Sequence, residues 1–102
     1  MSAPAANGIK IQPTSDGFSL IGPVTIATAS RIIDAARESW PEQGVSIVDF
    51  AGVTEADSVA LALIFKWQRD AASRDRVVRC INIPANVVAL ARLYGVDELI
   101  GA

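Results

Sequence analysis

The sequence contains no histidine and a single cysteine, Cys80, and these absences limit the chemistry that we expect of the chain. Histidine is the commonest general base and metal ligand, and one cysteine without histidine does not build a typical zinc site. The phosphate-binding loops G-x-x-x-x-G-K-[ST] and G-x-G-x-x-G do not occur either. A lone cysteine in an apolar run also excludes an intramolecular disulfide framework and favours a buried structural thiol. We therefore expect a non-catalytic protein with no metal and no cofactor.

Long apolar runs are missing as well. No stretch approaches the roughly 20 residues that span a bilayer. The first residues, MSAPAANG, have neither the basic region nor the apolar segment of a secretory signal. We expect residues 1–8 to be a flexible tail, residues 9–102 to form one domain, and the protein to be cytoplasmic.

Hydrophobic residues make up 51% of the chain and charged residues 20%, and the mean hydropathy is +0.35. Such a composition is typical of a compact globular domain. The high hydropathy has two explanations that the composition leaves open. Either the interior is very rich in Ala, Val and Ile, or part of the surface is normally covered by a partner.

The charges are unevenly distributed, although the formal net charge is only −2. Five of the nine basic residues lie in one short stretch: Lys66, Arg69, Arg74, Arg76 and Arg79. This run is typical of a solvated helix end followed by a connection, and contact with an acidic partner is the alternative. Nucleic-acid binding is not indicated, because the chain is acidic overall and no aromatic residues interleave with the basic ones.

The pattern of apolar residues predicts the element order β-β-α-β-α-β-α. Ile9–Gln12 and Phe18–Ile21 read as a hairpin that Gly22-Pro23 ends, and a helix over Thr25–Trp40 is capped by Thr25 or Thr28 and stopped by Pro41. Strands follow at residues 45–50 and 77–83, and helices after each of them. The last helix begins at Pro84, buries Val87, Leu90, Ala91 and Tyr94, and ends at Gly95, with one short turn beyond it. These units predict an α/β fold with a four-stranded mixed sheet and helices mainly on one face.

The chain is organised around the stretch from Val45 to Trp67. Val45–Phe50 is an apolar, β-branched run, and residues 51–56 read as a turn. Asp57 and Ser58 then open a helix, and their side-chain oxygens suit the free N–H groups of a first helical turn. Asp49, Glu55 and Asp57 bring acids to this loop, but hard cations usually need more converging oxygens, so no metal site is predicted.

Two apolar stripes run along this helix. Leu61, Ile64 and Phe65 share one face, which we expect to cover the core. Val59, Leu63 and Trp67 recur at i, i+4 and i+8 on roughly the opposite side. Because a helix on a sheet needs only one apolar stripe, we expect the second to contact a partner. Trp40, in the preceding helix, is interpreted as a core anchor rather than a ligand platform.

The order of an aspartate-ending strand, a loop with a second Asp and a helix opened by Ser resembles the STAS domain (sulfate transporter and anti-sigma factor antagonist). The positions that match are Asp49, Asp57 and Ser58, and the resemblance extends through Gly22–Thr25 and Ile81–Val96. Within the family the chain looks most like the small cytoplasmic subunit of the Mla-type phospholipid-transport ABC transporter. One departure is that Val59 and Ala60 replace the small residues that usually follow the Ser or Thr.

The resemblance implies two alternative roles for Ser58, and helix capping is compatible with both. In the first, the domain is a constitutive subunit that docks on the ATPase of the transporter, held peripheral to the inner membrane through this partner, and supports the maintenance of lipid asymmetry. In the second, it is an anti-sigma factor antagonist, and a partner that is both kinase and anti-sigma factor phosphorylates Ser58. Val59 beside the hydroxyl and the second apolar stripe favour permanent docking, and a STAS domain with another partner stays open. The partner-binding residues that we expect are Thr54, Asp57, Ser58, Val59, Leu63 and Trp67.

Overall fold

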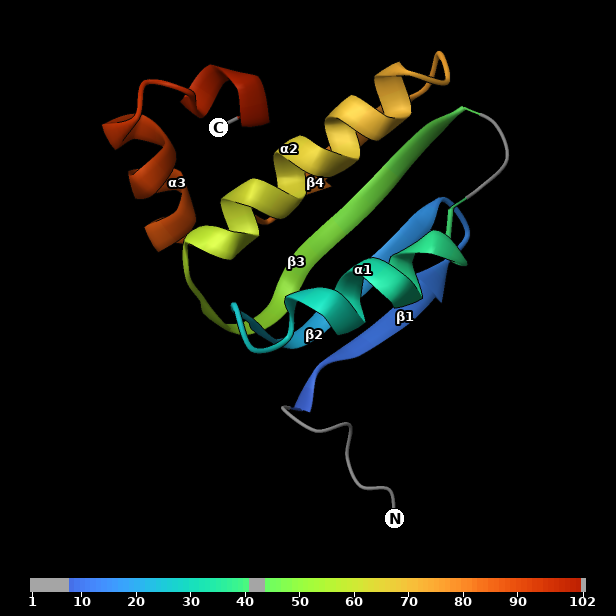
Figure 1. Ribbon diagram of the computed structural model, residues 1–102, viewed down its shortest axis with the longest axis horizontal. Coiled ribbons are helices and arrows are strands. Elements are labelled where there is room, and N and C mark those ends of the chain that lie inside the picture. The colour runs from blue at the N-terminus through green and yellow to red at the C-terminus, as the bar shows by residue number, and fades with distance from the viewer. Residues whose placement is uncertain (1–7, 41–43, 102) are drawn as a thin grey trace.

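The computed structural model describes residues 8–40 and 44–101, and its elements follow the expected order (Figure 1). The first two strands are followed by three helices that alternate with two more strands, and then by a short 3-10 helix. The bounds are β1 Lys10–Thr14, β2 Gly17–Val24, α1 Ala29–Arg37, β3 Val45–Ala56, α2 Ser58–Ala72, β4 Val77–Ile81, α3 Ala85–Leu93 and η2 Asp97–Ile100. The tail predicted for residues 1–8 and the helix stop at Pro41 fall largely or wholly outside the described residues.

The sheet is four-stranded and mixed, in the order β1-β2-β3-β4. β1 and β2 form an antiparallel hairpin in which Lys10 lies opposite Ile21. β3 is parallel to both of its neighbours, with Phe18 opposite Val48 and Val48 opposite Cys80. The predicted fold class is thus confirmed, because both β-α-β crossovers produce parallel pairs.

β3 is twice as long as predicted, and the expected turn at residues 51–56 is wrong. Its second half pairs with the end of β2, so that Ile21 lies opposite Gly52 and Val24 opposite Ala56. β2 likewise continues past the predicted stop at Gly22-Pro23, with register shifts on both sides of Ile21–Gly22. Pro is tolerated in a strand at such an irregularity, because no ladder hydrogen bond is required of it there.

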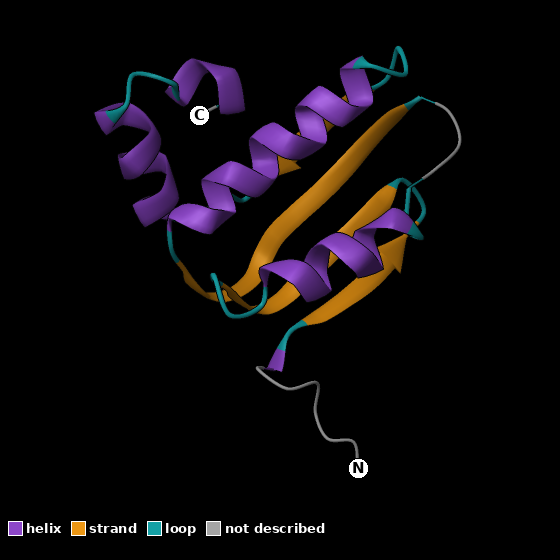
Figure 2. Cartoon of the chain, in the orientation of Figure 1, coloured by secondary structure: helices purple, strands orange, loops and turns teal. Residues whose placement is uncertain are grey.

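α1 and α2 lie on one face of the sheet, and α3 lies to the side of α2 (Figure 2). The other face carries no described α-helix. α2 lies between the other two and contacts both α1 and α3. α1 is shorter than the predicted span of residues 25–40, and Thr28 at its start makes no side-chain cap bond to the helix. Instead the buried Thr28 hydroxyl accepts a hydrogen bond from Thr25 N–H and donates to the carbonyl of Pro23, which fixes the turn into α1.

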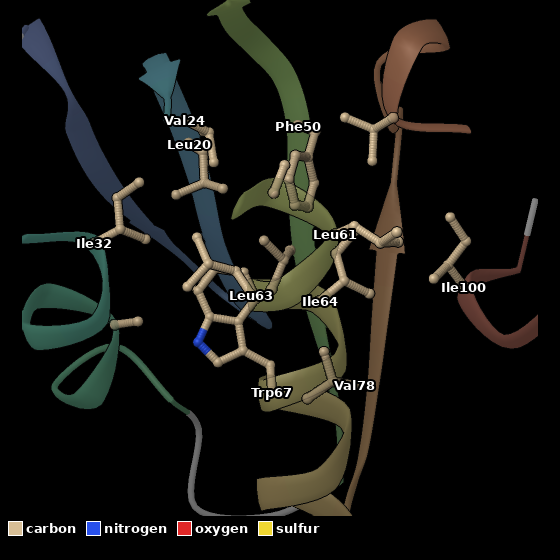
Figure 3. Packing of buried hydrophobic residues seen from close by; sticks show 14 of the residues in the cluster. Leu20, Val24, Ile32, Phe50, Leu61, Leu63, Ile64, Trp67, Val78 and Ile100 are labelled. Carbon is tan, nitrogen blue, oxygen red and sulfur yellow. The ribbon is translucent and has the colours of Figure 1, made fainter. Parts of the chain in front are cut away.

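The central position of α2 corrects the predicted second apolar stripe. Leu63 is 3% exposed and Trp67 2% exposed, so neither forms an outward surface. Figure 3 shows Leu63 and Trp67 on the side of α2 toward β2, and Leu61 on the side toward β4. The neighbour that the second stripe requires is the chain itself, because a helix between two others is covered on both flanks.

Three aromatic rings fill the space on the α1 side of α2. The ring centroids of Phe18 and Trp67 are 5.5 Å apart, those of Phe18 and Trp40 4.9 Å, and those of the two tryptophans 5.9 Å. All three pairs are edge-to-face, the arrangement that the ring quadrupoles favour. Trp40 is therefore a core anchor, as predicted.

The C-terminal elements have the predicted types and order, but β4 ends at Ile81 instead of residue 83 and α3 begins at Ala85. Pro84 is the N-cap of α3, Gly95 follows its C-cap with a φ of 71°, and η2 is the expected short turn. Val87 and Ala91 are buried, but Tyr94 is 66% exposed and is not part of the stripe that packs on the core. Tyr94 is the C-cap of α3, where the backbone dihedral angles are no longer those of an α-helix, so its side chain does not continue the buried stripe.

Candidate functional site

Three connections meet at the carboxyl end of the parallel strands. They are the turn from β2 into α1, the step from β3 into α2, and the segment from β4 into α3 (Figure 1). In open α/β sheets this edge is where ligands and partners are usually bound, because the helix N-termini and the variable loops gather there.

Asp57 holds two of these connections together. It is the N-cap of α2, and one carboxylate oxygen accepts a hydrogen bond from Val59 N–H at 2.8 Å. The other oxygen accepts one from Ile26 N–H at 3.0 Å, in the turn before α1. The predicted cap is confirmed, and Asp57 has the further role of fixing Ile26 beside the start of α2.

Ser58 is the first residue of α2 and is exposed. Among the described residues its hydroxyl has no hydrogen-bond partner, because Asp57 makes the cap. A serine at this position keeps a free donor and acceptor at the positive end of a helix dipole.

Ile26 is 76% exposed although it is a large aliphatic residue. Its backbone N–H donates to Asp57, the residue before Ser58, so the backbone of Ile26 is held close to the start of α2. Single exposed apolar residues are common on protein surfaces. Ile26 differs in that its backbone is hydrogen-bonded to the N-cap of α2, so it places an apolar side chain at an edge that is otherwise polar. We call Ile26, Thr54, Asp57, Ser58 and Val59 the Ser58 surface.

Asp49 and two asparagines tie the third connection to the same edge. An Asp49 carboxylate oxygen accepts hydrogen bonds from Ala51 N–H at 2.8 Å and from the Asn82 amide at 3.0 Å. The Asn86 amide donates to the carbonyl of Ala56 at 2.8 Å, which ties α3 to the end of β3. Asp49 is thus a structural link between strands, and Asn82 adopts a left-handed φ of 55° to make it.

The acids at this edge do not form a metal site. Within residues 8–40 and 44–101 there is no group of three or more Asp, Glu, Cys or His side chains arranged to hold a metal ion. Asp49 and Asp57 instead use their oxygens on backbone and amide N–H groups. The chemistry that the edge offers is hydrogen bonding and apolar contact.

Comparison with known proteins identifies the architecture. A family model described as "Mlab, STAS domain" matches residues 7–101. The chain belongs to the STAS domain family. STAS domains are protein-interaction modules of transporters and anti-sigma factor antagonists.

A solved structure supports the same fold. The crystal structure of a sulfate transporter family protein from Wolinella succinogenes superposes with a TM-score of 0.62, over 99% of this chain and 83% of that one. The sequences are 17% identical, so the likeness concerns the STAS fold alone. No curated protein matches the sequence.

Of the six residues predicted to bind a partner, the structure brings four to this edge of the STAS domain. Thr54 and Ser58 are exposed, and Asp57 and Val59 are partly buried beside them. Leu63 and Trp67 belong to the core, as described above. Sequence reasoning missed Ile26, Asn82 and Asn86. The signal for Ile26 was the predicted parallel pairing, which places the end of β2 beside the end of β3.

Cys80 is partly buried, whereas its sequence context predicted a buried thiol. Desolvation raises its pKa to about 12, from an ordinary value of 9.0. A thiol with so high a pKa is a poor nucleophile and metal ligand at neutral pH.

Within the described residues, no helix has the length and apolar character needed to cross a membrane.

Proposed function

We propose that the chain is a non-catalytic STAS subunit that docks through the Ser58 surface on the ATPase of an Mla-type phospholipid-transport ABC transporter. In this role it supports the ATPase from the cytoplasm and takes no part in the chemistry. The observation that carries the proposal is the pairing of an exposed hydroxyl, Ser58, with an exposed isoleucine, Ile26, on one fixed edge. The name of the matching family model and the sequence resemblance support the choice of transporter.

The geometry favours a preformed contact surface. Both oxygens of Asp57 are used within the domain, one on each side of the edge, so the surface does not need to be ordered when a partner binds. Preorganisation reduces the entropy that binding costs and suits a permanent complex. The apolar contact also suits it, because desolvation of an aliphatic side chain adds to affinity.

The proposal is tested by identifying the protein that co-purifies with the tagged chain from its own cells. We expect an ABC transporter ATPase. Ser58→Thr should retain the complex, because threonine keeps the oxygen at the same place. Ser58→Asp should lose much of it, because the charge would be buried against an apolar rim.

Ile26→Asp tests the apolar half of the surface, and it should also weaken the complex. Leu93→Asp is the matched control, because Leu93 is a similarly exposed aliphatic residue at the far end of α3. If Ile26→Asp and Leu93→Asp leave the same amount of ATPase bound, the Ser58 surface is not the docking surface.

The alternative is an anti-sigma factor antagonist that is switched by phosphorylation of Ser58. The observation that favours it is the free, exposed hydroxyl at a helix N-terminus, which a kinase can reach and where a phosphate is locally favourable. The added charge of about −2 beside Asp57 would repel an apolar partner. The mass of the intact protein from its own cells, with and without phosphatase, separates the two functions. A substantial phosphorylated fraction at Ser58 would favour the switch.

Neither of these functions requires an enzymatic activity of this chain. We expect that the purified protein hydrolyses neither ATP nor GTP. Turnover that survives removal of contaminants and disappears when Ser58 or Asp57 is replaced would contradict this expectation.

A further inference from the structure

The two edges of the sheet differ in how well they are protected against pairing with another chain. β1, at one edge, has the sequence KIQPT, with a charged residue at its start and Pro13, which has no N–H to donate, near its end. Lysine and proline are the usual means of blocking an edge strand. β4, at the other edge, has the sequence VVRCI, which contains neither.

Within the described residues β4 pairs with β3 alone, and residues 78–81 of β4 line a groove. The groove has a volume of about 390 Å³ and lies between β4, Gln68 of α2 and η2. The Gln68 amide donates a hydrogen bond to the carbonyl of Leu99 at 2.8 Å, which fixes η2 as the far wall. Leu99 is largely exposed, so the wall is partly apolar. The strand edge thus has an open space beside it.

The side chains of β4 define what would fit there. Val78 is buried, whereas Val77, Arg79 and Ile81 are exposed on the helix-free face, as alternation in a strand requires. Arg79 forms no ion pair with another described residue. A strand added along this edge would place its own residues opposite these three, and cross-strand pairs are favourable when apolar meets apolar and opposite charges meet.

We propose that the β4 edge binds an extended segment of a partner polypeptide as a fifth strand, with the pattern apolar–x–acidic–x–apolar. The acidic residue lies opposite Arg79, and the two apolar residues lie opposite Val77 and Ile81. The intervening residues face the groove beside Leu99. This surface is separate from the Ser58 surface, so the proposal stands or falls independently of the proposed function.

A second copy of the chain fits this edge poorly. Antiparallel pairing about a two-fold axis centred on β4 would set Arg79 directly against Arg79 of the copy, and like charges opposite each other are destabilising. A shift by two residues would instead set Arg79 against Val77 and lose the apolar pair. A segment with an acidic residue opposite Arg79 can form an ion pair with it, and we therefore assign the edge to another polypeptide.

The test uses the full chain labelled with ¹⁵N and the peptide acetyl-Thr-Val-Thr-Glu-Thr-Val-Thr-amide. We expect saturable shifts of the backbone amides of residues 77–81. Replacing the glutamate of the peptide by lysine should weaken binding roughly three- to tenfold, and Arg79→Glu should reverse that preference. Lys10→Glu is the matched control, because it makes the same change of charge at the β1 edge and should leave the affinity unaltered. Ser58→Asp should also leave it unaltered.

N-methylated peptides test strand pairing without changing the protein. The N–H groups of alternate residues in a strand point to the same side. Methylating the set that faces β4 should abolish binding, and methylating the other set should not. The proposal is overturned if both sets bind equally, if the shifts centre on β1, or if no saturation is reached at millimolar peptide. A free chain that sediments as a dimer, and becomes a monomer when Val77 is replaced by lysine, would also overturn it by making a second copy the occupant.

Discussion

Replacing Leu63 by alanine should destabilise the fold about as much as replacing Leu61. The two leucines lie on opposite flanks of α2, but they are 3% and 6% exposed and both belong to the core (Figure 3). Truncating a buried leucine removes its apolar contacts and leaves a cavity that the surroundings fill only in part, at about 2–5 kcal/mol. Domains of this size have total stabilities of about 5–15 kcal/mol, so either variant loses a large share.

Urea unfolding followed by tryptophan fluorescence measures the effect, because Trp40 and Trp67 report on the same core. With an m-value of about 1–3 kcal/mol/M, the midpoint should fall by on the order of 1–2 M for both variants. Leu93→Ala is the matched control, since Leu93 is 77% exposed, and its effect should stay within about 0.5 kcal/mol. The assignment of Leu63 to the core is refuted if Leu63→Ala behaves like Leu93→Ala while Leu61→Ala does not.

Three further predictions follow from single contacts. Asp57→Ala removes the cap and the link to Ile26, and it should lower the free energy of unfolding by about 1–2 kcal/mol in thermal unfolding. Asp57→Asn keeps an acceptor oxygen at the cap and should cost less. Equal losses would contradict the capping role. Gly22→Ala should destabilise more than Gly44→Ala in thermal unfolding, because both glycines have positive φ but the added Cβ at Gly22 would overlap the carbonyl oxygen of Gly8. Because the pKa of Cys80 is raised from 9.0 to about 12, its thiolate fraction at pH 8 is about a thousandfold lower than that of an ordinary thiol. Iodoacetamide should therefore label Cys80 far more slowly than it labels the new thiol of the double variant Cys80→Ala, Ser58→Cys. Equal labelling rates would show that the Cys80 thiol is accessible and ionised.

The sequence predicted the element types because apolar periodicity is a local property. It failed at the ends of β2 and β3, where pairing between distant segments decides. Gly52 and its neighbours resemble a turn when they are considered alone. In the structure, a Cβ at position 52 would lie 3.0 Å from the carbonyl oxygen of Leu20, so this glycine allows two strands to approach closely. Its residue type is explained by a strand contact that no local pattern contains.

The candidate site was predictable to the extent that it depends on residue types next to each other in the chain. Asp57 before a run of helix formers is sufficient to predict a cap. Ile26 meets it from 31 positions away. That contact exists because β2 and β3 are parallel neighbours, so their carboxyl ends coincide. The exposed hydroxyl was therefore identified, whereas the apolar residue beside it required the topology.

The burial of Leu63 and Trp67 changes where a partner should be sought on this fold. Two apolar stripes on one helix indicate two covered flanks, and the chain can supply both covers when the helix lies between two others. Here α1 and the aromatic cluster cover one flank of α2, and β4 and α3 approach the other. The side of α2 is then unavailable, and two surfaces that stay open to a partner are the N-terminus of the helix and the unprotected edge of β4. Trp67 is 2% exposed, so a partner that used it as a contact residue would have to disturb the three edge-to-face pairs among Phe18, Trp40 and Trp67, and the loss of those pairs opposes such a movement.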